Sequence, residues 1–393
     1  MDRDRGGSEV RIRHRGRIRH TLLPMAPMLP MDRRNFARLS ALALAATQVP
    51  SLAQDPATGQ RPIGYAAIGL GTISDIFMRA CAKSATAKIT ALVTGHPETK
   101  GKHYAAMYAI PESSVYTYET FDRIRENKDV DAVYVGLPNS MHREYTVRAA
   151  QLDKHVLCEK PMAISSTECS EMIAACRTAN VKLMIAYRVH YEPTHLETQR
   201  LIQSGALGQL QSFEGGFGFN AKPGQWRLTR KYGGGGSLMD VGIYPLNETR
   251  WLTGEEPAAF TAVTATRDHA SGRFADVEQT VNWTMKFPSG IVAALACTYG
   301  ANMPSFLRIH GDKGSLEITN AYAYQGVHLT SLGGNSHVDI TSQGDDTMHF
   351  QIEAEHFANC IRTGTVPKTP GEEGLHDLLA IEAVYKTAGT PIA

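Results

Sequence analysis

The sequence predicts an α/β fold followed by an α+β fold, and three observations lead to this prediction. Its 393 residues are enough for two ordinary domains. Residues 62–187 alternate short apolar runs with helical patterns, which is typical of a doubly wound parallel sheet. After about residue 208, apolar and polar residues alternate instead, which indicates a largely antiparallel sheet.

In the first half we expect strands and helices in strict alternation. The apolar runs are rich in β-branched residues, and a helical pattern separates each run from the next. The expected strands span 62–69, 87–94, 131–137, 155–159 and 182–187, and the expected helices span 73–84, 97–108, 140–152 and 166–179. These elements predict a first domain at 62–187.

The second half is expected to hold an antiparallel sheet and two closing helices. Tight turns such as Pro288–Gly290 and Gly311–Gly314 interrupt its alternating runs. The expected strands include 209–219, 259–268, 277–287 and 290–299, and the expected helices lie near 350–363 and 372–388. We therefore predict a second domain over 188–393.

Residues 1–53 have a composition of their own and are left out of the fold prediction. They hold ten arginines and four acidic residues, and the rest of the chain has 30 basic and 35 acidic residues, a net charge of −5. The arginine pair at 33–34 precedes an apolar run at 39–46 and a small-x-small site at 51–53. This arrangement is typical of a twin-arginine export signal. It predicts a periplasmic protein whose mature chain begins near Gln54 after cleavage. An ordinary amphipathic N-terminal helix is the alternative.

Nucleic-acid, membrane-spanning and metal functions are not expected. The basic stretch at 11–20 lacks the interleaved aromatic residues of a nucleic-acid arm. No uncharged stretch reaches the roughly 20 residues of a membrane span. The six cysteines form no C-x-x-C pair, and no histidine cluster has zinc spacing. Cys169 and Cys176 lie about two turns apart on one expected helix, too far for a disulfide, so buried free thiols are expected.

A glycine-rich turn after the first expected strand predicts a dinucleotide site. The stretch GLGTIS at 69–74 reads G-x-G-x-x-G with serine in the third glycine position. Gly69 permits a tight turn, Gly71 lets the backbone approach a pyrophosphate, and the next helix offers free N–H groups to that anion. The motif lies between an expected strand and an expected helix, which is the context that it requires.

The end of the second expected strand favours NADP over NAD. A fold that binds NAD usually has an acidic residue there, which accepts from the ribose 2′-OH, but this sequence reads Thr94-Gly95-His96. Thr94 supplies a hydrogen-bond donor and Lys100 a positive charge for a 2′-phosphate. A solvated helix face is the alternative for Lys100.

A lysine follows the strand expected at 155–159. Lys160 stands between Glu159 and Pro161, and a side chain at the carboxyl end of such a strand points into the ligand crevice. Pro161 restricts the backbone before it and makes a cis peptide bond a candidate. We expect a catalytic role for Lys160, with an ordinary surface charge as the alternative.

The stretch GGGGSLMDVGIY at 233–244 adds two titratable groups. Ser237 is expected to cap a helix. Asp240 and Tyr244 then lie one turn apart on the same face of that helix. The glycines before them allow the backbone to pass close to bulky ligands.

These motifs together resemble the glucose–fructose oxidoreductase / inositol dehydrogenase (Gfo/Idh/MocA) family. The resemblance covers nearly all of the chain from residue 62, and within the family it is closest to the glucose–fructose and aldose–aldose oxidoreductases. The stretches that carry it are LPNSMH (137–142), CEKPMA (158–163), KLMIAYRVHYEP (182–193), QWRLTR (225–230), GGGSLMDVGIYPLNETRWLTGEEP (234–257) and PGEEG (370–374).

The resemblance implies a Rossmann domain followed by a domain with a large, open-faced, mostly antiparallel sheet. It implies tightly bound, non-dissociating NADP and hydride exchange with small sugars. Because an uncovered sheet face tends to be buried against a partner, we also expect a homo-oligomer, a dimer or a tetramer. Lys160, Asp240 and Tyr244 match the catalytic positions of the family.

The resemblance also carries over a set of cofactor contacts. Besides Gly69, the matching positions are Gly71, Thr72, Ile73, Thr94, Lys100, Tyr118, Leu137, Asn139, His142, Glu159, Lys160, Arg188, Trp226 and Arg227. The loop after Thr94 is one residue longer than in the family, so Thr99 is an alternative to Lys100.

Two further residues have open roles. His190 is expected either to contact a ligand or to be structural. Trp226 is expected either to stack on a ligand or to pack between the domains.

The expected reaction oxidises one aldose to its lactone or aldonic acid and reduces a second sugar to its alditol, in ping-pong fashion. Oxidation of the C1 hydroxyl needs a base for its proton, and the ammonium of Lys160 would favour the phenolate of Tyr244. Asp240 would bind a sugar hydroxyl and orient Lys160. A buried tyrosine packed in a helix is the alternative for Tyr244.

Two other functions stay open. One is an NAD(P)-dependent aldose 1-dehydrogenase that releases its cofactor. The other is a non-catalytic sugar or nucleotide sensor, against which the retention of Lys160, Asp240 and Tyr244 argues.

Overall fold

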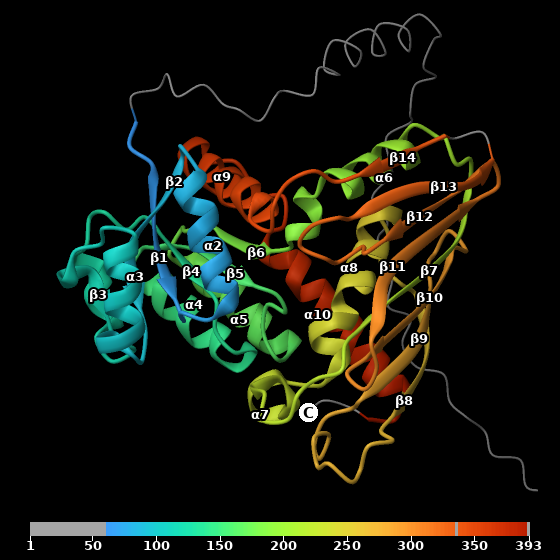
Figure 1. The fold of residues 1–393 in the computed structure, drawn as a ribbon, viewed down its shortest axis with the longest axis horizontal. Helices are drawn as coiled ribbons and strands as arrows, with labels where there is room; N and C mark the ends of the chain where they lie inside the picture. Colours follow the sequence, from blue (N-terminus) through green and yellow to red (C-terminus); the bar gives the residue numbers. More distant parts are fainter. Residues whose placement is uncertain (1–59, 335–336, 391–393) are drawn as a thin grey trace, which may run out of the picture. The chain divides into compact units, whose positions relative to one another are not determined.

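The computed structural model describes residues 60–334 and 337–390, which belong to one compact unit, Pro56–Ala393. The predicted export signal lies outside these residues. The described chain forms two sheets with helices packed on them (Figure 1). No helix in this part of the chain is long and apolar enough to cross a bilayer. All six cysteines are free and buried, as predicted.

The first sheet is parallel, six-stranded and doubly wound, which confirms the predicted fold class. Its strand order is β3-β2-β1-β4-β5-β6, the order of a dinucleotide-binding Rossmann fold. The strands are β1 (Ile63–Ile68), β2 (Ala87–Val93), β3 (Val115–Tyr116), β4 (Ala132–Val135), β5 (His155–Glu159) and β6 (Leu183–Ala186). The sequence did not predict β3, because two residues are too short for a visible period.

Helices cover both faces of this sheet, so its strands are apolar on both sides. The helices of the first half are α2 (Thr72–Lys83), α3 (Lys102–Met107), α4 (His142–Gln151) and α5 (Ser166–Thr178). On the α2 face, Phe77 stacks on Tyr134 with ring centres 3.8 Å apart. The helix expected at 97–108 is divided, since Pro97–Gly101 forms a π-helical turn before α3. A π-turn takes up one extra residue, which accommodates the longer loop noted after Thr94.

The second sheet has eight strands in the order β14-β13-β12-β11-β7-β10-β9-β8. They are β7 (Leu210–Gly218), β8 (Ala259–Ala265), β9 (Thr280–Lys286), β10 (Val292–Thr298), β11 (Met303–Gly311), β12 (Gly314–Thr319), β13 (His328–Gly334) and β14 (Asp339–Thr341). Neighbours are antiparallel except β7 and β10, which are parallel. Burial alternates along β9, so one face packs inward and the other is exposed.

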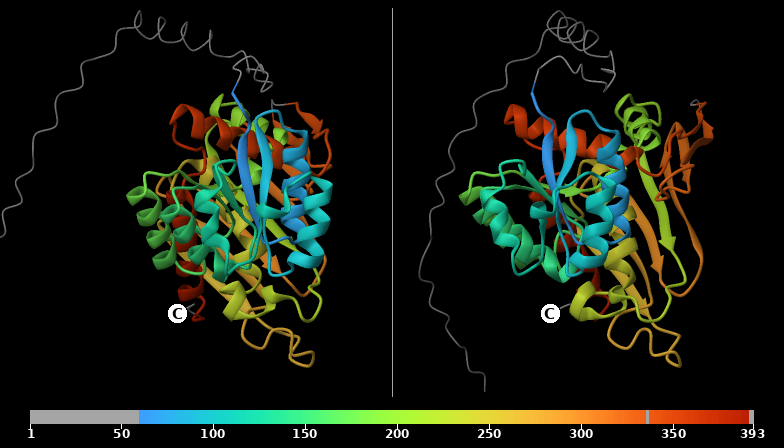
Figure 2. Two further views of the ribbon diagram at one scale, coloured as in Figure 1. Left: turned by 90° about the vertical axis from the view of Figure 1, so that its left-hand side faces the viewer. Right: turned by 60° about the vertical axis from the view of Figure 1, so that its left-hand side comes forward.

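The helices of the second half join the two sheets. They are α6 (Pro193–Gln203), the short α7 (Arg230–Gly233), α8 (Ile243–Thr253), α9 (Met348–Thr363) and α10 (Gly371–Thr387). Figures 1 and 2 show α9 lying beside α2 on the first sheet, while α10 packs against α5 and β8. The ends of the first sheet are therefore held against the second, and the candidate site lies where they meet.

Candidate active site

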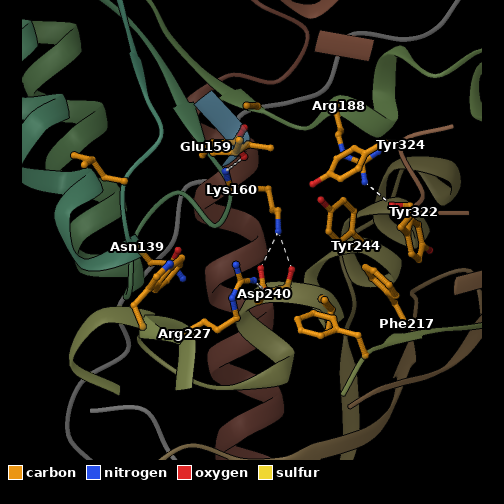
Figure 3. A pocket seen from close by; sticks show the side chains of 16 residues that line it. Asn139, Glu159, Lys160, Arg188, Phe217, Arg227, Asp240, Tyr244, Tyr322 and Tyr324 are labelled. Atoms are coloured by element: carbon orange, nitrogen blue, oxygen red, sulfur yellow. Dashed lines mark hydrogen bonds and ion pairs between the residues drawn. The ribbon is translucent and has the colours of Figure 1, made fainter. Parts of the chain in front are cut away.

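A cavity of about 210 Å³ lies between the carboxyl ends of β4–β6 and the second sheet (Figure 3). Of the predicted site residues, it is lined by Ile73, Leu137, Asn139, Glu159, Lys160, Arg188, Trp226, Arg227, Asp240 and Tyr244. The cavity also has an aromatic wall that the sequence did not reveal, formed by Phe217, Phe219, Tyr322 and Tyr324. The residues predicted to be catalytic thus come together in one pocket.

Lys160 reaches across this cavity from the end of β5. Its ammonium donates to the main-chain oxygen of Asp240 at 2.8 Å and lies 3.4 Å from a carboxylate oxygen of the same residue. Burial lowers the pKa of Lys160, but Tyr244, Asp240 and Glu159 outweigh burial and raise it overall. Lys160 is therefore held as a cation. The peptide bond between Lys160 and Pro161 is cis, as proposed from the sequence.

The carboxylate of Asp240 is enclosed by donors. One oxygen accepts from the hydroxyl of Tyr299 at 2.7 Å and from the guanidinium of Arg227, while the other faces Lys160. Burial alone would raise the pKa of Asp240, but Lys160 and Arg227 lower it to about 2. Asp240 is thus ionised and fixes Lys160, as predicted. Tyr299 was not predicted, because it follows β10, far from Asp240 in the sequence.

Tyr244 follows Asp240 at the start of α8. The ammonium of Lys160 lies 4.4 Å from the centre of its ring and the guanidinium carbon of Arg188 lies 5.1 Å away. The ring of Tyr322 stacks on it at 5.2 Å. Two cations and a stacked ring therefore hold the phenol in place.

The prediction that Ser237 caps the helix is wrong. Its side chain makes no capping bond, and its backbone is already helical. The hydroxyl instead accepts from the thiol of Cys297 at 3.4 Å. The carboxylate of Glu278 takes the capping role, accepting from the amides of Gly236 at 2.8 Å and Leu238 at 2.9 Å. A carboxylate from a distant strand segment has no local sequence signal.

The glycine-rich turn fits a dinucleotide pyrophosphate. Gly69 has a φ of +80°, and a Cβ there would lie 2.7 Å from the carbonyl oxygen of Gly136, so only glycine fits. At Gly71 no described atom lies within 4 Å of an added Cβ. Gly71 is also the N-cap of α2 and supplies no side-chain cap. The first-turn N–H groups of α2, including those of Thr72 and Ile73, thus face open space suited to an anion.

Three further residues predicted as cofactor contacts, Thr94, Lys100 and Tyr118, do not line the cavity. Lys100 donates to the main-chain oxygen of Leu70 at 3.0 Å, so Lys100 rather than Thr99 reaches the glycine-rich turn. The hydroxyl of Thr94 accepts from the amide of His96 at 3.1 Å. The ring of Tyr118 packs on Tyr145, with ring centres 5.5 Å apart.

Three predicted cofactor contacts are occupied by bonds within the protein. Asn139 lines the cavity, and its amide donates to the main-chain oxygen of Gly233 at 2.9 Å. Buried His142 does not line the cavity, because its ring nitrogens lie against the carbonyls of Leu137 and Pro161 at 2.8 and 2.9 Å. Arg188 donates to the main-chain oxygen of Tyr322 at 2.6 Å. These residues therefore position the walls of the site.

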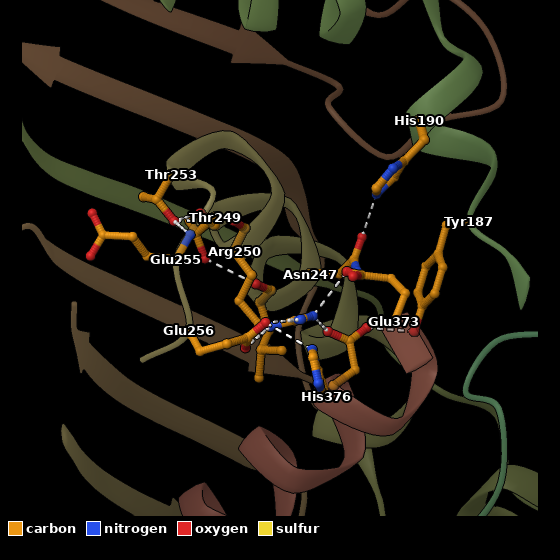
Figure 4. Close-up of polar contacts among 12 residues, drawn as sticks. Tyr187, His190, Asn247, Thr249, Arg250, Thr253, Glu255, Glu256, Glu373 and His376 are labelled. Atoms are coloured by element: carbon orange, nitrogen blue, oxygen red, sulfur yellow. Dashed lines mark hydrogen bonds and ion pairs between the residues drawn. The ribbon is translucent and has the colours of Figure 1, made fainter. Parts of the chain in front are cut away.

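A second polar network lies behind α8 (Figure 4). Arg250 pairs with Asp377, Glu373 and Glu256, and Asp377 accepts from the hydroxyl of Tyr187 at 2.5 Å. These bonds tie α8, which carries Tyr244, to α10 and to the end of β6.

His190, left open by the sequence, belongs to the same network. Its Nε2 lies 2.8 Å from the side-chain oxygen of Asn247, and its ring stacks on Trp251 with centres 4.2 Å apart. The buried ring of His190 does not line the cavity and is structural.

Two family models match this chain. Residues 63–187 match "Oxidoreductase family, NAD-binding Rossmann fold", and residues 195–317 match "GFO/IDH/MocA C-terminal domain". The chain is 32% identical to D-xylose 1-dehydrogenase [NADP(+)] of Haloarcula marismortui over 345 residues, 86% of this chain and 94% of that protein. It is 27% identical to D-xylose 1-dehydrogenase (NADP(+)) 2 of Haloferax volcanii, over 84% of this chain and 97% of that protein.

A solved structure with a similar fold is aldose–aldose oxidoreductase from Caulobacter crescentus complexed with glycerol. It shares 44% sequence identity with this chain, with a TM-score of 0.79, and the match covers 84% of this chain and 98% of that one.

Proposed function

Because the chain belongs to the Gfo/Idh/MocA oxidoreductase family, we propose that it is an NADP-dependent enzyme that oxidises and reduces CH–OH groups of sugars. The observation that carries the proposal is the joining of Lys160, Asp240 and Tyr244 in one cavity beside a Rossmann sheet. The relatives named for D-xylose and for aldoses support a sugar as the substrate.

The residues around the glycine-rich turn would hold the cofactor. Gly69, Gly71 and the first turn of α2 suit the pyrophosphate, and Thr94 with Lys100 suits a 2′-phosphate, since no acidic side chain ends β2. Bound NADP would supply a hydride acceptor and, when reduced, a hydride donor. The nicotinamide end would face the cavity that Lys160 and Tyr244 line.

The protein's own groups handle the substrate proton. Tyr244 as a phenolate takes the proton of the reacting hydroxyl, and as a phenol it returns a proton to a carbonyl oxygen. Lys160 donates a hydrogen bond to the substrate oxygen. Asp240 keeps Lys160 charged and aimed, and its remaining acceptor capacity is available to a sugar hydroxyl.

In its finer form, the proposal is a closed cycle with captive NADP. One aldose is oxidised to its lactone or aldonic acid, and a second sugar is then reduced to its alditol by ping-pong transfer. The 44% identity to an aldose–aldose oxidoreductase supports this form. The relatives named D-xylose 1-dehydrogenase support the alternative, an aldose 1-dehydrogenase that releases its cofactor.

Purified protein without added nucleotide distinguishes the two forms. Denaturation should release about one NADP(H) per chain, and a mixture of aldoses should yield aldonate and alditol in equal amounts. The Lys160→Ala variant should bind nucleotide but make neither product. A protein that arrives empty and turns over only with added NADP would be the releasing dehydrogenase.

We also propose export and self-association. The arginine pair at 33–34 and the apolar run after it support the twin-arginine route, which carries folded proteins and so allows NADP to be loaded first. The exposed face of the second sheet includes Val263, which is 67% exposed, and Val292, and this face supports a dimer or tetramer. Cell fractionation and the mass of the purified protein in solution test these two proposals.

A further inference from the structure

Tyr324 places a second phenol in the cavity, beside Tyr244. It lies in the segment between β12 and β13, lines the cavity and is 39% exposed. Across the described ranges 60–334 and 337–390, no protein group hydrogen-bonds its hydroxyl. The charged groups of the cavity differ in this respect, since Lys160, Asp240 and Arg227 are bonded to one another. The hydroxyl of Tyr324 is therefore available to a ligand.

Arg188 fixes the position of this phenol. Its guanidinium donates to the main-chain oxygens of Tyr322 at 2.6 Å and Ala323 at 3.1 Å, which anchors the segment that carries Tyr324. The guanidinium carbon lies 4.5 Å from the centre of the Tyr324 ring and 5.1 Å from that of Tyr244. Figure 3 shows the two phenols side by side near Arg188. A cation over an aromatic face restricts the ring without occupying its hydroxyl.

The two phenols differ in their surroundings. Lys160 lies against the ring of Tyr244, while Tyr324 is the more exposed of the two phenols. Burial, followed by the proximity of Tyr244, raises the pKa of Tyr324. Tyr324 is thus a neutral phenol at physiological pH, able to donate or accept a hydrogen bond and unsuited to act as a base.

We propose that Tyr324 is a substrate-positioning residue that hydrogen-bonds a second hydroxyl of the sugar whose first hydroxyl reacts at Lys160 and Tyr244. This proposal rests on the proposed sugar oxidoreductase function. A sugar carries neighbouring hydroxyls on a rigid ring, so two adjacent phenols match two of its oxygens. Tyr324 would then select polyhydroxylated substrates over simple alcohols.

The test removes one hydroxyl from the protein and one from the sugar. Tyr324→Phe holoenzyme is assayed with a parent aldose and with a series of its monodeoxy derivatives. We expect kcat/KM for the parent aldose to fall roughly 10-fold, mainly through KM, as for a lost neutral hydrogen bond. For one monodeoxy sugar the wild type and the variant should have equal kcat/KM, because that sugar lacks the hydroxyl that Tyr324 would bind.

Tyr232→Phe is the matched control. Tyr232 is 40% exposed and does not line the cavity, so its variant should match the wild type with every sugar. Equal losses for Tyr324→Phe across the whole deoxy series, or no loss at all, would overturn the proposal. Loss of bound nucleotide from this variant would also overturn it, by making Tyr324 a cofactor contact. A wild-type enzyme that oxidises no aldose would instead refute the proposed function.

Discussion

The ammonium of Lys160 lies 2.8 Å from the main-chain oxygen of Asp240 and 4.4 Å from the centre of the Tyr244 ring. Lys160 ends a strand of the first sheet, whereas Asp240 and Tyr244 belong to the helical segment that packs on the second sheet. The site is therefore complete only because the two halves are held together.

Replacing Lys160 should remove the chemistry without removing the cofactor. In Lys160→Ala no cation faces the Tyr244 ring from this side, and the substrate oxygen loses a donor, so we expect kcat to fall by about 10³-fold. Lys386→Ala, at an exposed position on α10, serves as the control and should have the kcat of the wild type. Turnover and nucleotide content are measured together, and undiminished turnover in Lys160→Ala would refute the site assignment.

Tyr299 is expected to affect turnover because it helps to hold the carboxylate of Asp240 in place. Tyr299→Phe removes the hydroxyl that donates to the Asp240 carboxylate at 2.7 Å, leaving Arg227 and Lys160 as its partners. Because hydrogen bonds to charged groups contribute about 1.5–3 kcal/mol, we expect kcat to fall roughly tenfold or more.

A buried tyrosine elsewhere separates this effect from a loss of stability. Tyr116 accepts a hydrogen bond from Asn127 at 3.1 Å, far from the cavity in the fold. Tyr116→Phe should change the melting temperature and leave kcat alone. Equal kcat values for Tyr299→Phe and the wild type would show that Arg227 and Lys160 suffice to hold Asp240.

Glu278 should stabilise the segment that carries Asp240. Its carboxylate accepts from the amides of Gly236 and Leu238 and from the hydroxyl of Tyr385 at 2.9 Å. Glu278→Ala leaves these donors without an acceptor, which should lower the free energy of unfolding by about 2–4 kcal/mol. Urea unfolding measures this change, with Glu98→Ala at an exposed site as the control. A change below about 0.5 kcal/mol would mean that water replaces the carboxylate.

Local patterns in the sequence predicted five of the six strands of the first sheet, the glycine-rich turn and the three residues that meet in the cavity. The partners of those residues were not predictable, because they come from elements far apart in the chain. Tyr299 follows β10 and reaches Asp240 because β10 packs against the helical segment Leu238–Gly242. Hydrophobic periodicity does not report which elements are neighbours. Glu278, which replaces Ser237 as the cap, is missed for the same reason.

Glu353 on α9 should be a destabilising residue at neutral pH. Its side chain is fully buried, and neither carboxyl oxygen has a hydrogen-bond partner among the described residues. Burial, with Glu159 nearby, raises its pKa well above the usual range. The folded pKa exceeds the unfolded value of about 4.3, so folding favours the protonated carboxyl. The contribution of Glu353 to the free energy of unfolding is therefore complete below about pH 4.3 and is lost as the pH rises through the folded pKa.

Glu353→Leu tests this account. The apolar side chain removes an unpaired buried carboxyl, so the free energy of unfolding at neutral pH should rise by about 1–3 kcal/mol. Glu355→Leu, on the partly exposed side of the same helix, should give no such gain. A loss of stability in Glu353→Leu would show that the carboxyl has a partner, such as a bound water.

His190 should make the protein sensitive to acid. Burial lowers the pKa of His190 to about 3, below the unfolded value of about 6.5. Between these two pH values the unfolded chain binds a proton that the folded chain does not. The free energy of unfolding is therefore highest above about pH 6.5 and falls as the pH is lowered toward 3. Between pH 6.5 and 5 this loss amounts to about 2 kcal/mol.

His190→Gln should remove that part of the pH dependence. Glutamine keeps a donor for Asn247 but does not titrate, so stability should fall less between pH 6.5 and 5 than in the wild type, as measured by urea unfolding at each pH. Some loss should remain, since burial also lowers the pKa of His349 to about 3. His269→Gln, at an exposed position, should leave the wild-type slope. An unchanged slope in His190→Gln would mean that His190 binds its proton equally well in the folded and unfolded protein. Because His190 and Arg188 share one helical turn, acid should reduce activity along with stability.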